Sequence, residues 1–572
     1  MILFAAAWAL PFGANPIERC LRANDVPCAK SALEAAGADS TTDPDLLAMR
    51  AQVAFYDGDF PTAFDSLAAA VDAGWEDNWA SLPLYERTLF ATEGWAEQPV
   101  EGSRFRVRFL PGLDEVLLDG AGEALVKTEQ HVTPLLGDVP PGNTLLEIYP
   151  DSRSFIAASS LTATDVRTTG VVALSKWSRL LVTSPRALAR GYDWQDTIAH
   201  EYIHLVVAHN TDDRAPVWLQ EAIAKYLDAR WKDGKDHWRL SVRDQGLLAE
   251  ALANDDLVTF DEMHPSLAKL PTAERAALAY AQVSALMAFC FEKAGPDVLL
   301  KALPLVKNGT DAREALAQGA GYTRFAKLEK DYLDWLKTLD LKKSELSELP
   351  TVFAEDGVDD GAIDPVLSRR EDLHRFVRLG TLLREHERPK AALVEYEKAR
   401  DPDEPNSPYL SNMIAQTWLE LKDVTAAERE LAESVVDYPE FALTHKTLGA
   451  IRRARNDLPG ALSAYQEAAE LNPYDPSVQA AQVELAERLG RGDEAKRRRA
   501  MLSVLREGGS DTDWKPLHDR SGEYTLPGGA ESSDAEGLAA AFKGEQAPQF
   551  RVKDLEMEFF SLGDFAGEVV VL

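Results

Sequence analysis

The stretch that decides the fold runs from Asp193 to Trp231 and reads DWQDTIAHEYIHLVVAHNTDDRAPVWLQEAIAKYLDARW. Its first half contains the motif H-E-x-x-H, formed by His200, Glu201 and His204 and flanked by helix-forming residues. On a helix, positions i and i+4 lie one turn apart on one face, so the two imidazoles can bind one tetrahedral zinc ion while the glutamate reaches water. The motif therefore predicts His200 and His204 as metal ligands and Glu201 as the catalytic base.

Glu221, seventeen residues after His204, is the predicted third ligand. It follows a loop that contains Pro and lies in an apolar helical stretch, where Trp218, Leu219 and Ile223 mark the neighbouring positions as core. A helix packed back against the first would complete a His₂Glu site with its fourth position open. The alternative is an ordinary glutamate on a helix surface.

His209 is a weaker candidate for the third ligand. The metzincin pattern requires Gly three residues and His six residues after the second histidine. Here Val207 replaces the glycine, and His209 comes one residue early. We therefore expect His209 to be a histidine at the end of a helix.

The composition limits the classes of function. The chain has 572 residues, with 61 Lys and Arg against 94 Asp and Glu, which gives a net charge of −33. Such a surface repels nucleic acid and anionic membranes. No apolar run is long enough for a membrane-spanning helix, and at roughly 150 residues per domain the length predicts about four domains.

The N-terminus and the cysteines bear on whether the protein is exported or stays in the cytoplasm. Residues 1–15 are almost wholly apolar, like the hydrophobic part of a signal peptide, which predicts an exported protein. The alternative is a buried helix in a cytoplasmic protein. Cys20 and Cys28 could form a disulfide in an oxidising compartment or remain two buried thiols, and Cys290 is expected in the core.

Helical repeats are predicted on both sides of the motif. Residues 16–99 contain a helical hairpin, with its turn at Asp57-Gly58-Asp59. In residues 368–506 the prolines Pro405, Pro439 and Pro473 are 34 residues apart, the period of tetratricopeptide repeats. Such an array predicts a protein partner on its concave face, and the alternatives are a spacer or an intramolecular clamp.

Residues 100–345 form a region of different character. Strands are predicted in SRFRVRFL, NTLLEIYP, TTGVVALS and RLLVTSP, and a helix is predicted over 114–136. A small sheet leading into helices predicts an α+β domain. Residues 346–367 and 507–545 are predicted linkers.

HEYIH, a loop with Pro and VWLQEAIAKY together resemble the peptidase MA-like branch of the gluzincin metallopeptidases, over about residues 103–340. One departure is Ala222, where that family commonly has Gly. The resemblance implies an α+β zincin (gluzincin-like) metallopeptidase domain that uses Zn²⁺ to hydrolyse peptide bonds. Together with the repeats, the expected fold class is this domain plus all-α tetratricopeptide-repeat solenoid regions.

Further residues are candidates for stabilising the oxyanion, orienting a ligand or binding the substrate backbone. A tyrosine from a downstream helix stabilises the oxyanion in that family, and Tyr280 is the matching position, although it could equally be a half-buried helix aromatic. Tyr226 is a weaker candidate. Asp196 could orient a ligand imidazole, and residues Gly170 to Leu174 could offer a strand edge to an extended substrate.

The last segment, residues 546–572, resembles the start of a thioredoxin-like domain and ends in the predicted strand Val569 to Leu572. We expect this domain to be truncated in the given sequence, so no redox chemistry is assigned. The alternative is an added strand that docks on the metallopeptidase domain.

The sequence thus predicts an exported zinc-dependent peptidase that acts on a peptide or protein substrate. The alternatives are a repeat scaffold with a catalytically idle zincin domain, and a redoxin fusion whose redox domain is incomplete.

Overall fold

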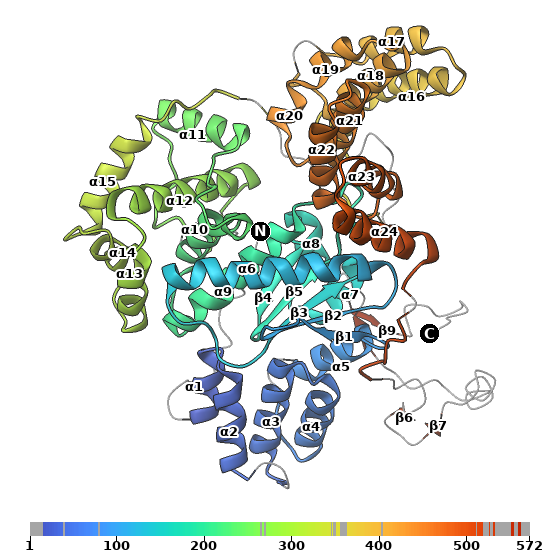
Figure 1. Cartoon of the computed structure of the whole chain (residues 1–572). Helices are drawn as coiled ribbons and strands as arrows, with labels where there is room; N and C mark the ends of the chain where they lie inside the picture. The colour runs from blue at the N-terminus through green and yellow to red at the C-terminus, as the bar shows by residue number, and fades with distance from the viewer. Residues whose placement is uncertain are drawn as a thin grey trace.

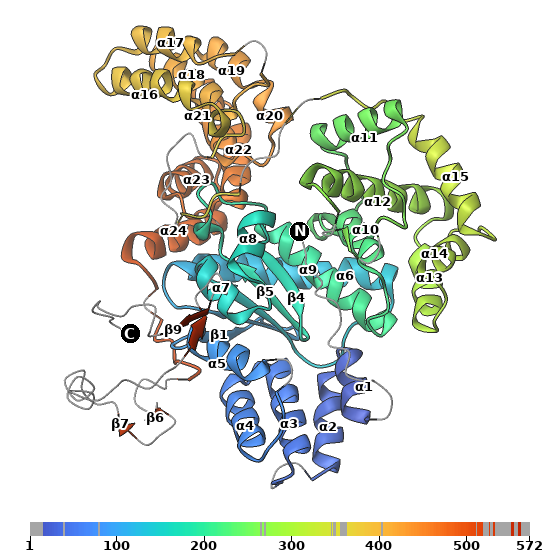
Figure 2. The same ribbon diagram turned by 180° about the vertical axis from the view of Figure 1, so that it is seen from behind.

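The computed structural model of the chain describes residues 15–37, 41–77, 80–263, 266–267, 270–344, 346, 351–354, 363–401, 404–510, 512–518, 525–526, 530–531, 551–553 and 559–561. Most of the predicted signal segment and the predicted strand Val569 to Leu572 lie outside these residues. Figure 1 and Figure 2 show a small sheet at the centre, N-terminal helices below it, and two helical lobes above it on opposite sides.

The central sheet has five strands in the order β1-β2-β3-β5-β4. The strands are β1 Ala96–Pro99, β2 Phe105–Phe109, β3 Thr144–Tyr149, β4 Ala173–Lys176 and β5 Arg179–Thr183. β2, β3 and β5 run parallel, whereas β1 and β4 are antiparallel edge strands. All four predicted strands are confirmed, but β4 begins later than the sequence suggests. Gly170 ends the helix α8 (Ala163–Thr169) in a left-handed conformation, with φ of 66°, and β4 itself starts at Ala173, next to Val172 O, which accepts a hydrogen bond from Thr183 N at 2.7 Å.

One face of the sheet is apolar and is covered by helices α6 (Leu118–Leu136) and α9 (Trp194–Thr211) (Figure 1). Phe105, Val107 and Phe109 alternate along β2 and join the large core on this side. Short elements complete the layer around the sheet: η2 Leu113–Leu117, α7 Ser152–Ala158 and η3 Pro185–Ala187. The strand alternation of β2 therefore places its aromatic and aliphatic side chains in the core.

The opposite face of the sheet is charged but is also buried. Glu147 and Arg179 are fully buried and form an ion pair, and Arg108 Nη1 lies 3.4 Å from Glu147 Oε1. Arg108 also donates to the Gly58 carbonyl at 2.8 Å, in the turn between helices α3 (Pro44–Asp57) and α4 (Phe60–Asp72). The predicted N-terminal hairpin thus exists and covers this face.

The N-terminal helices contain the paired cysteines. Helices α1 Pro16–Arg22 and α2 Val26–Ala35 are joined by the Cys20–Cys28 disulfide, and α5 (Ser81–Ala91) completes the group. The disulfide-closed turn contacts the rest of the molecule, because Ala23 O lies 2.5 Å from Nδ1 of His209. His209 lies in the last turn of α9, as predicted.

A helical lobe follows α9 along the chain. It consists of α10 Val217–Leu227, η4 Arg230–Lys232, α11 Val242–Asn254, α12 Ala273–Ala294, α13 Val298–Lys307, α14 Ala312–Gly319 and α15 Phe325–Leu336. Cys290 is fully buried in α12, as predicted. Among the described residues, no helix is both long and apolar enough to cross a bilayer.

The second lobe is the repeat array of helix pairs, α16 Glu371–Glu385, α17 Pro389–Lys398, α18 Pro408–Glu420, α19 Val424–Leu431, α20 Ser434–Asp437, α21 Ala442–Ala454, α22 Leu458–Leu471, α23 Pro476–Arg488 and α24 Gly492–Glu507. Two glycines allow their helix pairs to pack closely. A Cβ atom on Gly449 would lie 2.9 Å from the ring of Tyr465, and Gly380 packs in the same way on Tyr396. The 34-residue pattern therefore corresponds to a repeated steric fit between helices.

Both predicted linkers contain packed segments. Phe353, in the linker 346–367, is 3% exposed and bridges to Leu188. In the linker 507–545, Trp514 packs edge-on against Phe109, with 5.0 Å between ring centroids, and Leu517 N donates to Trp95 O at 2.7 Å. Their polar composition suggested free linkers, but a few apolar side chains are enough to hold them against the core.

Two short hairpins lie beyond the repeat array in the chain. They are β6 Thr525–Leu526 with β7 Ala530–Glu531, and β8 Arg551–Lys553 with β9 Phe559–Ser561.

Candidate metal centre

Helices α9 and α10 bring the three predicted ligands together. The Nε2 atoms of His200 and His204 are 3.0 Å apart. Oε2 of Glu221 lies 3.4 Å from Nε2 of His200 and 3.7 Å from Nε2 of His204. Among the described residues, this is the one group of histidine, cysteine and acidic side chains whose ligand atoms converge in this way.

The three side chains fit a zinc ion. In a tetrahedral site with bonds of about 2.0–2.1 Å, ligand atoms are about 3.3–3.4 Å apart, close to the spacing of these three atoms. Glu221 is 1% exposed, and within the described part of the chain its Oε1 has no hydrogen-bond partner. A buried carboxylate requires a compensating charge, which a divalent cation supplies.

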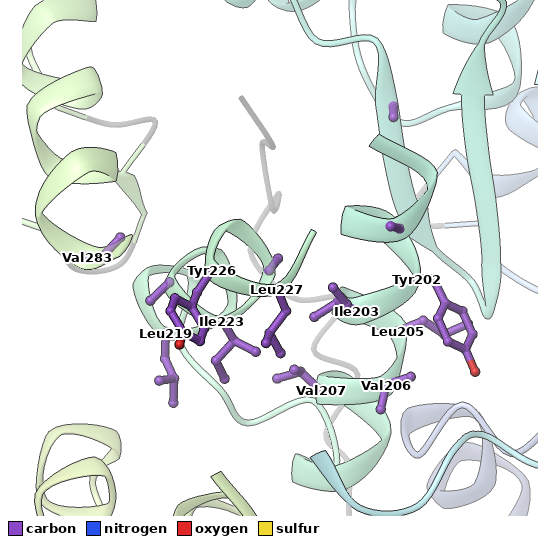
Figure 3. Close-up of a cluster of buried hydrophobic side chains, with 14 of the residues drawn as sticks. Tyr202, Ile203, Leu205, Val206, Val207, Leu219, Ile223, Tyr226, Leu227 and Val283 are labelled. Atoms are coloured by element: carbon purple, nitrogen blue, oxygen red, sulfur yellow. The ribbon is translucent and has the colours of Figure 1, made fainter. Parts of the chain in front are cut away.

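Apolar packing between α9 and α10 sets this geometry. Figure 3 shows Ile203 and Val207 of α9 facing Ile223 and Leu227 of α10. All four side chains are fully buried. Ala222, at the position where the resembled family has Gly, is also fully buried, so the fold accommodates a methyl group there.

Two side chains on or beside α10 interact with the two imidazoles. Nδ1 of His200 lies 3.6 Å from Oδ2 of Asp228, just past the end of the helix. The side chain of Gln220 raises the pKa of His204 against the effect of burial, and its Nε2 donates to the Ala215 carbonyl at 3.0 Å. Such outer partners fix the orientation of a ligand ring and leave its other nitrogen for the metal.

The prediction that Asp196 orients a ligand imidazole is wrong, and the sequence did not predict Asp228 or Gln220 for this role. Asp196 accepts a hydrogen bond from Trp231 Nε1 at 2.8 Å and pairs with Lys232 at 3.0 Å. The sequence feature that could have identified Asp228 is its spacing from Glu221. Asp228 follows it by two helical turns and therefore lies on the same face.

Glu201 lies beside the ligands and is shielded from solvent. It is 2% exposed, and its carboxylate accepts a hydrogen bond from the backbone of Ser175 in β4. Burial raises the pKa of Glu201 to about 7, although the neighbouring His200 opposes the shift. A carboxylate with a pKa near neutrality can both accept and return a proton.

The charges of the two imidazoles are set by their surroundings. Burial lowers the pKa of His204 to about 4, so this ring is neutral at pH 7, as a metal ligand must be. Burial also acts on His200, but hydrogen bonds to Asp228 and Glu221 raise its pKa to about 9. The carboxylates around His200 thus favour positive charge at this position.

The two candidate tyrosines differ in their surroundings. The Tyr226 hydroxyl donates to Asp236 at 2.6 Å, and its ring packs on Phe291. Tyr280 is half-buried on α12, the helix that packs against α10. Its role at the oxyanion stays a prediction.

The fold class is that of a zincin-like α+β domain joined to all-α helical repeats. Residues 146–338 match the family model described as the Peptidase MA superfamily. This match supports the resemblance at the level of the superfamily, over a shorter range than the sequence suggested. No curated protein matches the chain.

Similar solved structures include a yeast LTA4 hydrolase, with 11% identity, coverage of 72% of this chain and 66% of that chain, and a TM-score of 0.26. The chain thus spans slightly less than two thirds of that protein. The yeast enzyme in complex with bestatin gives 13% identity, coverage of 72% and 67%, and a TM-score of 0.25. The Cut9-Hcn1 hetero-tetramer of the APC/C gives 13% identity, coverage of 86% of each chain and a TM-score of 0.21. With such low TM-scores, these likenesses assign no activity.

Proposed function

We propose that the chain is a zinc-dependent peptidase. The observation that carries this proposal is the convergence of His200, His204 and Glu221 beside the buried carboxylate of Glu201. The superfamily match over residues 146–338 supports the same class of activity. A purely structural zinc site would have no use for a buried base next to its ligands.

In this proposal, His200, His204 and Glu221 hold the metal. Bound zinc supplies a Lewis acid that polarises the peptide carbonyl and lowers the pKa of water. Glu201 accepts the proton of the attacking water and transfers it to the leaving amine as the peptide bond breaks. The Ser175 hydrogen bond fixes the position of the Glu201 carboxylate during both transfers.

The first test replaces the base but retains the metal site. Glu201→Gln is expected to keep zinc, measured by elemental analysis, and to lose about 10²- to 10⁴-fold in peptide hydrolysis, the usual contribution of a general base. Glu250→Gln, at an exposed position of α11, is the matched control and is expected to retain full activity. His204→Ala should lose both zinc and hydrolysis. Unchanged hydrolysis by Glu201→Gln would contradict the proposal.

We also propose that the protein works outside the cytosol. The support is the Cys20–Cys28 disulfide, because reducing compartments keep such pairs as thiols. The repeat array is proposed to bind a protein, either the substrate or a partner.

A further inference from the structure

The closed turn consists of residues 20–28, between α1 and α2, and the Cys20–Cys28 disulfide joins its two ends. α1 and α2 are 7 and 10 residues long, too short to be stable helices by themselves. They are held by a small core cluster, in which Ile17 and Leu21 of α1 pack with Val53 of α3. The shape of the closed turn therefore depends on its disulfide as well as on this packing.

The closed turn contacts the C-terminal end of α9. Its Ala23 carbonyl accepts a hydrogen bond from Nδ1 of His209, with 2.5 Å between the two atoms. His209 lies in the last turn of α9, five residues after His204, which corresponds to about 7.5 Å along the helix axis. The main chain of the closed turn is thus joined directly to the helix that carries both imidazoles and Glu201.

The closed turn also contacts the connection between β4 and β5. Oγ of Ser178 donates to Oδ1 of Asn24 at 2.9 Å. Trp177 and Ser178 form this connection with φ of 54° and 57°, and Ser178 is buried. Asn24 has φ of 51°, a left-handed conformation that asparagine adopts more readily than most residues. The neighbouring residues Ala23 and Asn24 therefore bond to α9 and to the end of β4.

A third contact holds the closed turn against the loop before β3. A Cβ atom on Gly142 would lie 2.6 Å from Cγ of Pro27, the residue that precedes Cys28. Gly142 also has φ of 80°, so glycine suits both the backbone and the close approach. The closed turn therefore contacts three separate elements of the α+β domain.

Two of these elements meet at Glu201. α9 packs directly against β4 and β5. Glu201 belongs to α9, and the backbone of Ser175 in β4 donates a hydrogen bond to its carboxylate. Ser178 follows Ser175 by three residues, which is about 10 Å at most. A shift of α9 along β4 would break this hydrogen bond and turn the carboxylate, and a misplacement of about 1 Å can cost about a hundredfold in rate.

The disulfide can be reached by a reductant from one side. Cys28 is exposed, whereas Cys20 is buried. A thiolate of a dithiol reductant can therefore attack Sγ of Cys28 and displace Sγ of Cys20, which takes up a proton. The second thiol of the reductant then displaces Cys28 as a thiol and leaves as a cyclic disulfide, so two electrons and two protons pass to the protein.

We propose that the closed turn positions α9 against β4 for hydrolysis, with His209 and Ser178 as positioning residues, and that this positioning requires the intact disulfide. The inference rests on the proposed peptidase function and adds a control of the same site. Reduction frees the ends of the closed turn, so its two hydrogen bonds no longer hold α9 and β4 in one relative position. The Glu201 carboxylate then loses its orientation, while the three ligands keep the metal. Because such disulfides form in oxidising compartments, full activity is expected only after export.

The test uses two kinds of variant in the full-length protein. Cys20→Ser combined with Cys28→Ser removes the disulfide, and His209→Ala removes the hydrogen bond to the Ala23 carbonyl. His209→Asn is the conservative variant, because its side-chain amide offers an N–H donor close to the position of Nδ1. Ser31→Ala, at an exposed position of α2, is the matched control and is expected to behave as the wild type.

Zinc content, Tm, and kcat and KM at 25 °C are measured with a fluorogenic peptide that the wild type cleaves. The double serine variant and His209→Ala should keep zinc and KM but lose about tenfold in kcat. His209→Asn should regain most of this loss, whereas a role in stability alone would lower Tm and leave kcat unchanged. Dithiothreitol, a dithiol, should lower the wild-type kcat to that of the double serine variant. It should leave that variant unchanged, which also controls for removal of zinc by the reductant.

The inference can fail in two distinguishable ways. Wild-type kcat in the double serine variant and in His209→Ala, or loss of zinc in place of a fall in kcat, would reject the positioning role and leave the peptidase function in place. If the double serine variant does not fold, the two His209 variants decide by themselves. Absence of any cleavage by the zinc-loaded, oxidised wild type would reject the proposed function and the inference with it.

Discussion

At the scale of residues, α9 supplies the two imidazoles and the base of the metal centre, and α10 supplies the third ligand and the outer partners. α10 carries Glu221 as the third ligand and Gln220 behind His204, and Asp228 behind His200 follows its last turn. Because the three side chains are fixed to one rigid element, the relative positions of ligand and outer partners depend little on loop motions. The imidazoles are therefore oriented before the metal binds.

Replacement of Asp228 tests this orientation. Asp228→Asn is expected to lower zinc affinity by about ten- to a hundredfold, because the His200 ring loses the carboxylate that fixes and polarises it. Affinity is measured by competition with a chromogenic chelator. Asp233→Asn, an acidic side chain that pairs with Lys235 and His237 outside the site, is the control. Equal affinities in the two variants would show that Asp228 does not support the ligand.

At the scale of elements, the edge strand β4 combines two roles. Its Ser175 backbone fixes Glu201, while Lys176 ends the strand with Nζ donating to Ser160 Oγ at 2.7 Å and lying 4.8 Å from the Trp177 ring centre. Burial lowers the pKa of Lys176 to about 8. A lysine on an edge strand also discourages pairing with another chain.

This lysine predicts a pH dependence of stability. The folded-state pKa lies below the value of 10.5 for an unfolded chain, so the unfolded chain holds the proton more tightly. The contribution of Lys176 to stability is therefore lowest below about pH 8 and rises as the pH increases from 8 to 10.5.

Lys176→Met removes the cost of charging this group and should raise the free energy of unfolding at pH 7 by about 1–2 kcal/mol, after allowance for solvent screening. The gain should shrink at pH 9.5. Urea unfolding at both pH values measures it, with Lys127→Met, at an exposed i,i+4 pair with Glu123, as the control. A gain that is equal at both pH values would rule out the proposed cause.

At the scale of the whole molecule, the second half of the repeat array is fixed to the zincin-like α+β domain. Asp114 accepts from Tyr474 and also receives two hydrogen bonds from Arg186, at 2.9 and 2.8 Å. Ser510 N donates to Glu115 at 3.0 Å on the same side of the domain. The array therefore moves with the active site at its C-terminal end, whereas α16–α20 extend away from it (Figure 1).

Tyr474→Phe should weaken this junction by about 1–2 kcal/mol, because Asp114 and Ser184 lose a buried partner. Amide hydrogen exchange is expected to become faster in residues 189–192 and at the end of α22. Tyr438→Phe is the control, since the Tyr438 hydroxyl is buried and has no hydrogen-bond partner among the described residues. Identical exchange in the two variants would show that the hydroxyl of Tyr474 does not hold the junction.

The sequence by itself determined the features that depend on local spacing. H-E-x-x-H on a helix places His200 and His204 on one face whatever the rest of the chain does, and the 34-residue period and the alternation in β2 are equally local. Glu221 could be predicted as a ligand for the same reason, because its apolar neighbours in the sequence mark a helix that must pack against the core.

Only the tertiary structure decided which distant groups meet. Asp196 and Asp228 are both carboxylates near the motif, and the rotation of α10 against α9 determines that Asp228 reaches His200. The alternation of β2 does not reveal that helices cover its arginine face, nor does a 34-residue period show where the array docks. These contacts depend on packing between elements far apart in the chain, which no local spacing encodes.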